Sequence, residues 1–333
     1  MNRFILSTTL TLAATPFAMH GADSSDSLNR WSLGPRIGLN FKADFRNSAS
    51  FFNPVNPGPA AGGADHTYDD GYVLVDSSGN AGGLTWNWGY QNASQVAGDS
   101  MQFHAIQPGG SSSTTGDPQY GVELVYQRVL GNLPAALPGS WGLEIGFSYT
   151  DLDLRSNTRG TASVTTDTFP LNGVLPPGAG YNGTFAGPGA LLGDTPVRTL
   201  GSATLTSRQK LSGQMFGIRL GPFAEWHFTP KLSLAASVGL TLAPTMVDYD
   251  FSETTSLAGG GTYAASGHSS KTSLLYGPYV GAMLRYDFHK SWGVFVGAQF
   301  QSLTALKQSA GSRTARLDPG ATVNVTAGFT WRF

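Results

Sequence analysis

The feature that most constrains this chain is an alternation of apolar and polar residues that persists over unusually long runs. Between Trp31 and Arg46 every odd-numbered residue is apolar, and every even-numbered residue is polar or small. A period of two predicts a β-strand with one apolar face and one polar face. The run is about 15 residues long, whereas strands of globular proteins usually have about 5 or 6 residues. The pattern therefore favours a fold that needs long strands over a soluble sandwich.

The same alternation recurs, which gives an even total of eight segments. The seven further segments are 120–127, 141–150, 216–228, 232–242, 274–288, 292–300 and 321–333. Their connections alternate in length: the short ones are 131–140, 229–231 and 289–291, and the long ones are 47–119, 151–214, 247–273 and 301–319. Short turns at one end and long loops at the other are typical of outer-membrane barrels. The sequence predicts an all-β fold, a transmembrane antiparallel up-and-down β-barrel with eight strands and long extracellular loops.

Aromatic residues gather near both ends of these segments. At about 3.3 Å per residue and a tilt near 40°, the stretch from Trp31 to Phe41 rises about 25 Å, the height of the apolar band of such barrels. Trp31 and Phe41 are therefore expected to mark the two membrane interfaces. The other aromatic residues follow the same two levels, which predicts two aromatic girdles.

The N-terminus has the pattern of a secretory signal peptide. A short positive start, Met1–Arg3, precedes a mostly apolar run, and the small residues Gly21 and Ala22 precede a polar stretch. The run is too short and too polar for an ordinary transmembrane helix. We expect a signal peptide at 1–22, with the exact cleavage site open, and a barrel at 23–333. No later segment approaches about 18 consecutive apolar residues, which excludes an α-helical membrane protein.

Composition excludes several classes of function. A net charge of −1 gives no basic footprint, so we expect no nucleic-acid partner. The absence of cysteine excludes disulfides, cysteine-based zinc sites and thiol nucleophiles. The six histidines lack a catalytic or metal-binding motif, and the Asp residues near Asp69 do not fit an EF-hand. We therefore expect no enzymatic activity, no cofactor and no bound metal, although a Ser, His and Asp site assembled across loops stays open.

Charged residues occupy the polar face of the predicted strands, which faces the lumen. They are Arg36, Lys42, Asp44, Glu123, Glu144, Arg219, Glu225, Arg285, Asp287 and Arg332. An eight-stranded barrel has room inside for little more than its own side chains. We expect these charges to pair into a network that fills the lumen. The alternative is a narrow ion path lined by the same residues.

The first long loop contains a second group of candidate residues, Trp86, Trp88 and Tyr90, near several Asp residues. Aromatic side chains with polar neighbours suit recognition, so these three could bind a glycan or a peptide. The alternative is that they pack the loop onto the mouth of the barrel. The alternation in 84–90 and 101–105 also predicts a hairpin in this loop. If that hairpin crossed the membrane, the barrel would have ten strands.

Together, the signal peptide, the eight segments, the alternating connections and the closing residues Thr330–Phe333 resemble the small outer-membrane barrels of the OmpA, OmpX and OmpW type. The resemblance implies recognition by the barrel-assembly machinery through C-terminal aromatic residues, here Phe329, Trp331 and Phe333. It also implies the cell outer membrane, with its lipid and lipopolysaccharide, as the surroundings. The first two loops are much longer than is usual in those families, which favours a function carried by loops.

We therefore predict an outer-membrane protein with a structural or surface-recognition role, adhesin-like, and an extracellular ligand for its long loops. The alternative is a small porin or channel for ions and small polar solutes.

Overall fold

The computed structural model of the chain describes residues 28–47, 65–75, 83–107, 111–116, 118–134, 138–183, 189–258, 261–311 and 313–333. The predicted signal peptide, 1–22, lies outside the described residues. Within the described ranges, no helix has the length and hydropathy that crossing a membrane requires.

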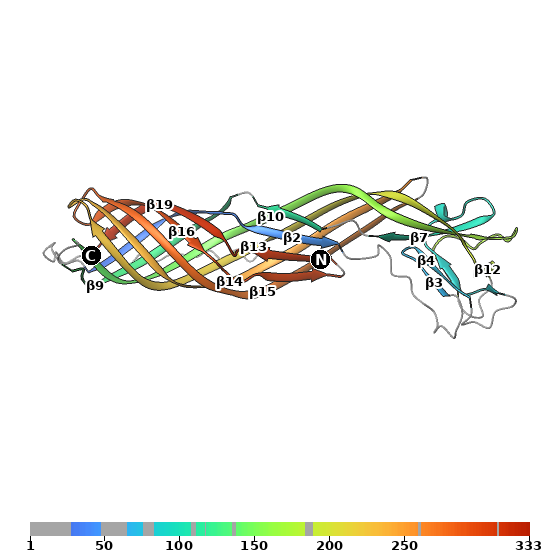
Figure 1. Ribbon diagram of the computed structural model, residues 1–333, viewed down its shortest axis with the longest axis horizontal. Helices are drawn as coiled ribbons and strands as arrows, with labels where there is room; N and C mark the ends of the chain where they lie inside the picture. Colours follow the sequence, from blue (N-terminus) through green and yellow to red (C-terminus); the bar gives the residue numbers. More distant parts are fainter. Residues whose placement is uncertain are drawn as a thin grey trace, which may run out of the picture.

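The described chain forms a closed antiparallel ring of eight strands (Figure 1). They are β1 (Asn29–Leu39), β9 (Gln119–Asn132), β10 (Gly139–Pro170), β13 (Val197–His227), β14 (Leu232–Leu257), β15 (Thr262–Asp287), β16 (Trp292–Gln301) and β19 (Thr322–Arg332). Each strand pairs with the next, and β1 closes the ring by pairing with β19, with Ile37 opposite Val325. The fold is the predicted transmembrane up-and-down β-barrel.

An apolar belt surrounds the short-turn end of the ring. On β13 the outward side chains Phe216, Ile218 and Leu220 are 40%, 41% and 58% exposed, while the intervening Arg219 is only 7% exposed. Large exposed apolar side chains also cover the outside of the other ring strands at this level. In water such a surface would be costly, whereas lipid tails solvate it. The alternation thus places apolar residues toward lipid, as predicted.

Four strands continue far beyond the belt. β10, β13, β14 and β15 have 32, 31, 26 and 26 residues and form the long rod seen in Figure 1. Much of the predicted loops 151–214 and 247–273 is therefore strand. On these extensions the outward residues are polar, such as Arg208 and Lys210, and the inward residues are apolar, such as Leu211 and Met215. In the belt the outer face of the sheet contacts lipid, whereas on these extensions the outer face contacts water. The outer face is therefore polar and the inner face apolar, the reverse of the belt.

The other four ring strands break at one level and continue as a separate sheet. This sheet contains β2 (Lys42–Asn47), β8 (Ser111–Thr115), β17 (Leu306–Ala310) and β18 (Arg313–Asp318), in the order β17-β18-β2-β8. We call the two facing four-stranded layers above the belt the upper barrel. Between β1 and β2, Asn40 adopts a positive φ of 65°, and the alternation shifts by one residue there.

This shift corrects the predicted placement of Phe41. Phe41, Ala43 and Phe45 point inward and are completely buried in the upper barrel, so Phe41 does not mark a membrane interface. They belong to an apolar core with members on both layers, among them Leu154 on β10 and Tyr249 on β14. Packing of these side chains across the interior holds the two layers together.

A small folded unit lies at the far end of the long strands, and we call it the head. It contains β3 (Asp65–Thr67), β4 (Gly71–Leu74), β6 (Trp88–Tyr90) and β11 (Tyr181–Asn182) in one sheet, the pair β5 (Leu84–Thr85) and β12 (Leu192–Gly193), the 3₁₀ turn η1 (Ala93–Gln95), and β7 (Ser100–Gln107). β6 pairs with β4 and β11, and β7 pairs with the end of β10. The predicted hairpin between 84–90 and 101–105 is therefore wrong, and the ten-stranded alternative is not adopted.

Candidate functional site

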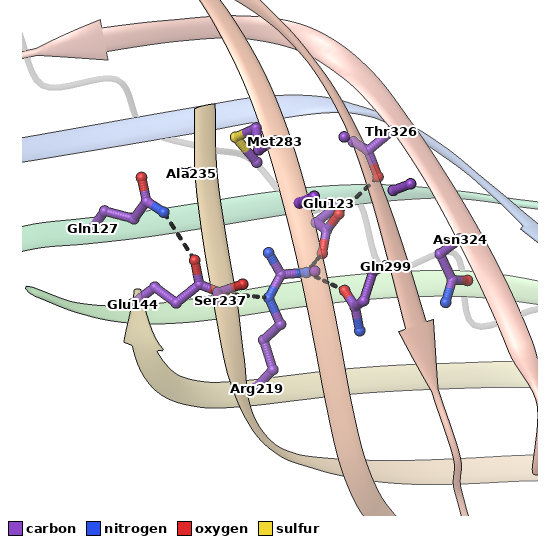
Figure 2. Close-up of a pocket in the computed structure, with 14 residues that line it drawn as sticks. Glu123, Gln127, Glu144, Arg219, Ala235, Ser237, Met283, Gln299, Asn324 and Thr326 are labelled. Carbon is purple, nitrogen blue, oxygen red and sulfur yellow. Dashed lines mark hydrogen bonds and ion pairs between the residues drawn. The ribbon is translucent and has the colours of Figure 1, made fainter. Parts of the chain in front are cut away.

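The first candidate site is a network of buried charges inside the ring. Glu123 on β9 is at its centre and accepts hydrogen bonds from Arg219 and from Thr326 Oγ1, the latter at 2.7 Å (Figure 2). Arg36 Nη1 lies 3.3 Å from Glu123 Oε1. Alternation puts all these side chains on the inward face of four different strands. Each of these side chains is at most 7% exposed, so Glu123 compensates buried guanidinium groups inside the protein.

Two further carboxylates extend the network toward the short-turn end. Glu144 accepts hydrogen bonds from Gln127 at 2.8 Å and Tyr279 at 2.9 Å, and its Oε1 lies 3.3 Å from Arg219 Nε. Arg30 Nη1 donates to both carboxylate oxygens of Glu225 at 2.9 Å, and Ser233 Oγ donates to Glu225 at 2.6 Å. Arg285, with no exposed surface, lies 3.0 Å from the same carboxylate.

This network leaves little free space in the lumen. The cavity between Glu123, Glu144 and Arg219 has a volume of about 20 Å³, and the cavity beside Arg36 has about 10 Å³. A single water molecule needs at least about 10–15 Å³ measured in the same way. Each cavity therefore holds on the order of one water, and neither provides a path for hydrated ions.

The structure places the ten predicted lumen residues in three groups. Arg36, Glu123, Glu144, Arg219, Glu225 and Arg285 form the network. Asp287 and Arg332 form a separate ion pair near the short-turn end. The predicted lumen position of Lys42 and Asp44 is wrong. Because the alternation shifts at Asn40, both residues lie on the outer face of β2, where they alternate with the buried Phe41, Ala43 and Phe45.

The sequence reasoning missed Arg30, which pairs with Glu225. The alternation could have placed Arg30 in the lumen, since it lies two residues before the inward Ser32 and has the same parity as Arg36. A second missed pair lies in the upper barrel, where Arg313 Nη2 is 2.8 Å from Glu253 Oε2 and Ser207 donates to the same carboxylate at 3.0 Å. This pair is buried inside the upper barrel, as is the apolar core.

The second candidate site, the aromatic residues of the first long loop, also differs from expectation. Trp88 is 0% and Tyr90 2% exposed, while Trp86 is half-buried. Trp88 and Tyr90 belong to the core of the head, with Tyr68, Phe103 and Phe169. The predicted recognition surface is therefore corrected for Trp88 and Tyr90, whose rings pack inside the head and not, as in the alternative, onto the mouth of the barrel.

Buried carboxylates tie the head to the long strands. Asp70 accepts hydrogen bonds from the backbone N of His104 at 2.7 Å and from Tyr263 at 2.8 Å, and its Oδ2 lies 2.6 Å from His104 Nδ1. Burial and the Asp70 charge raise the pKa of Tyr263. Among the described residues, no group of three or more His, Asp or Glu is arranged to hold a metal ion.

Asp167 near the end of β10 makes a second such tie. It accepts a 2.7 Å hydrogen bond from Tyr68 in the head and two 2.8 Å hydrogen bonds from Arg198 on β13. The hydrogen bonds from Arg198, followed by that from Tyr68, hold the pKa of Asp167 below its usual value despite burial. The carboxylate therefore stays charged at neutral pH and fixes the head on the β10–β13 hairpin.

The predicted assembly residues lie at the short-turn end. Phe329 and Phe333 are 60% and 49% exposed. The ring of Trp331 lies between those of Trp31 and Trp292, at centroid distances of 6.3 and 6.0 Å. These rings form the girdle expected at this edge of the belt.

The closed ring and the apolar belt decide the class of fold. The chain is a transmembrane β-barrel protein. No protein-family model and no curated protein matches its sequence.

Comparison with solved structures finds outer-membrane barrels. Ail, the attachment invasion locus protein of Yersinia pestis, is 9% identical with a TM-score of 0.29, and the match covers 91% of this chain and 97% of that one. The outer membrane protease OmpT from Escherichia coli is 12% identical with a TM-score of 0.30, covering 92% and 96%. The toluene transporter TodX of P. putida is 8% identical with a TM-score of 0.19, covering 93% and 91%. At these TM-scores, none of the similarities carries an argument about the role of this chain.

Proposed function

We propose that the chain is a non-enzymatic outer-membrane protein whose barrel is a closed scaffold and whose head takes part in recognition outside the cell. On this proposal residues 1–22 are removed as a signal peptide, and the barrel-assembly machinery inserts the chain through Phe329, Trp331 and Phe333. Lipid and lipopolysaccharide then surround the apolar belt.

The observation that carries the proposal is that the interior is filled at two levels. The charge network fills the ring inside the belt, and the apolar core with Phe41 and Tyr249 fills the upper barrel. A channel needs a continuous water path through both levels. Opening one would strand buried charges at the first level and expose apolar side chains at the second. This arrangement speaks against the channel alternative.

The head also has the properties of a presented surface. Its aromatic core and its carboxylate ties make it rigid, and rigid presentation lowers the entropy cost of binding. Two aliphatic side chains beside the head project into solvent: Leu175, which follows β10, is 91% exposed, and Leu200, near the start of β13, is 84% exposed. Such side chains are candidate contacts for an extracellular ligand, in place of the buried Trp88 and Tyr90.

Binding by intact cells tests the recognition role. Cells that display the wild-type chain are compared on surfaces coated with extracellular-matrix proteins or glycans, against cells displaying Leu175→Ser with Leu200→Ser. A matched control is Arg208→Ala, which changes an exposed residue of the upper barrel. We expect retention by at least one coating, a loss in the double variant, and no loss in the control. Equal retention of all three, or none above cells without the protein, would contradict the proposed role.

A further inference from the structure

The wall of the upper barrel has a seam between β8 and β10. The β9–β10 ladder ends where Gly121 is opposite Thr150, and β10 finds its next partner on this side only at Ser163, opposite Gln107 on β7. Between these points β8 lies beside β10 without a hydrogen-bonded ladder. The seam is bridged by side chains: Ser156 Oγ donates to Ser112 Oγ at 3.0 Å, and Gln119 Oε1 accepts from the backbone N of Asp153 at 2.7 Å.

The seam contains a groove with a volume of about 500 Å³. Volumes of about 300–1,000 Å³ are typical of small-molecule sites. Its walls carry hydroxyl, amide, carboxylate and guanidinium groups together with one aromatic ring, from Thr114, Thr115, Gln119, Tyr120, Asp153 and Arg155. The groove is therefore a polar site with a single flat apolar surface.

Two planar side chains in the groove are held in fixed orientation. Arg155 Nε and Nη2 donate to the two oxygens of Asp153 at 2.9 and 2.6 Å, while 62% of the Arg155 side chain and 41% of the Asp153 side chain stay exposed. A guanidinium has five N–H donors and a carboxylate about four lone-pair positions, so both keep hydrogen-bonding capacity for a ligand. The hydrogen bond from Arg155 also lowers the pKa of Asp153, which keeps this acceptor charged at neutral pH.

The aromatic ring belongs to Tyr120, which is 65% exposed at the lower edge of the groove. A tyrosine ring offers an apolar face and a polar tip. A pyranose has the matching surface: its C–H face packs on an aromatic ring, and its neighbouring hydroxyls pair with planar groups such as those of Asp153 and Arg155.

The charges of the groove select against an anionic ligand. Asp151 and Asp153 carry two negative charges and Arg155 carries one positive charge, while Lys210 lies opposite Arg155 on β13. The residues that line the groove thus carry a net negative charge, so a phosphate or carboxylate would gain no net attraction. A neutral, polyhydroxylated molecule fits this balance better.

We propose that the groove between β8 and β10 binds a short neutral saccharide, which stacks on Tyr120 and hydrogen-bonds to Asp153 and Arg155. The site lies at the edge of the belt, because the outward residues of β10 change there from Tyr149 to the charged Asp151. The saccharide can reach it either as a free oligosaccharide or as the head group of a glycolipid. The site does not depend on recognition by the head.

The test uses the mature chain in nanodiscs and has two arms. In the first, neutral oligosaccharides of two to six hexoses are titrated in solution, with sialylated and phosphorylated counterparts alongside. In the second, the nanodiscs contain a neutral glycolipid or the same lipid without its sugar. Binding is read from hydrogen exchange of 111–116, 118–122 and 150–156 and from affinity. Folding of each variant is verified by circular dichroism.

We expect a neutral sugar to protect these segments in at least one arm. Tyr120→Ala and Arg155→Ala should each weaken that binding more than tenfold, and Arg208→Ala, an exposed cation outside the groove, should leave it unchanged. Protection in the first arm identifies a free saccharide, and protection only in the second identifies a glycolipid. The proposal is overturned if neither arm shows binding, if both groove variants bind like wild type, or if only the anionic sugars bind.

Discussion

Glu225 is the residue whose replacement should destabilise the ring most clearly. It is 1% exposed, and its carboxylate compensates both Arg30 and Arg285, the second of which has no exposed surface. Glu225→Leu would leave both guanidinium groups buried without their carboxylate. Removal of one partner of a buried ion pair costs about 3–5 kcal/mol. At 1.4 kcal/mol per factor of ten, the unfolding equilibrium should shift roughly 10²- to 10⁴-fold.

Reversible urea unfolding of the mature barrel in lipid vesicles measures this cost. The double variant Glu225→Leu with Arg285→Met should recover part of the loss, because one of the two stranded charges is removed as well. Asp153→Asn breaks an exposed pair and should cost less than about 1 kcal/mol. If Glu225→Leu folds normally and also costs less than about 1 kcal/mol, the reasoning about buried compensation is refuted.

Three further predictions concern other levels of the molecule. Phe103→Ala removes a fully buried ring of the head and should cost about 3–5 kcal/mol locally, seen as faster hydrogen exchange of β6 and β7 with the ring unchanged. The stabilisation of the head by Asp167 should be fully present above the unfolded pKa of this carboxylate, about 4, and should be lost as pH falls through its lowered folded pKa. Asp167→Asn should abolish this acid dependence of the hydrogen-exchange rates in the head. Asn40→Gly should be tolerated, whereas Asn40→Val should cost about 1–3 kcal/mol in urea unfolding, because a β-branched residue is strained at positive φ.

The sequence predicted the ring and most of the lumen network, because a period of two fixes the side of every residue as long as the strand is unbroken. Arg219 and Glu144 could be placed from parity alone for this reason. The same rule failed at Lys42 and Asp44, since one residue with positive φ, Asn40, exchanges the two faces. The alternation of apolar and polar residues continues through Asn40 without a break, so the sequence pattern does not reveal that exchange.

The upper barrel and the head were harder to predict for a different reason. Alternation persists along β13 from Leu220 to Arg208, but the outer face passes from lipid to water, so the apolar residues change sides. The expectation of a loop at 151–214 missed this reversal. In the head, a short strand such as β6 has protein on both faces, so its sequence pattern does not distinguish a buried Trp88 from a solvent-exposed one.

Single-channel recording of the mature chain in a planar bilayer tests the closed barrel most directly. No discrete openings are expected from the folded wild-type chain, because among the described residues the network of Glu123, Glu144 and Arg219 and the apolar core above it occupy the interior at two levels. Frequent discrete openings from folded wild-type protein, altered by Glu144→Ala or Arg219→Ala, would contradict the account and identify the lumen as a pore.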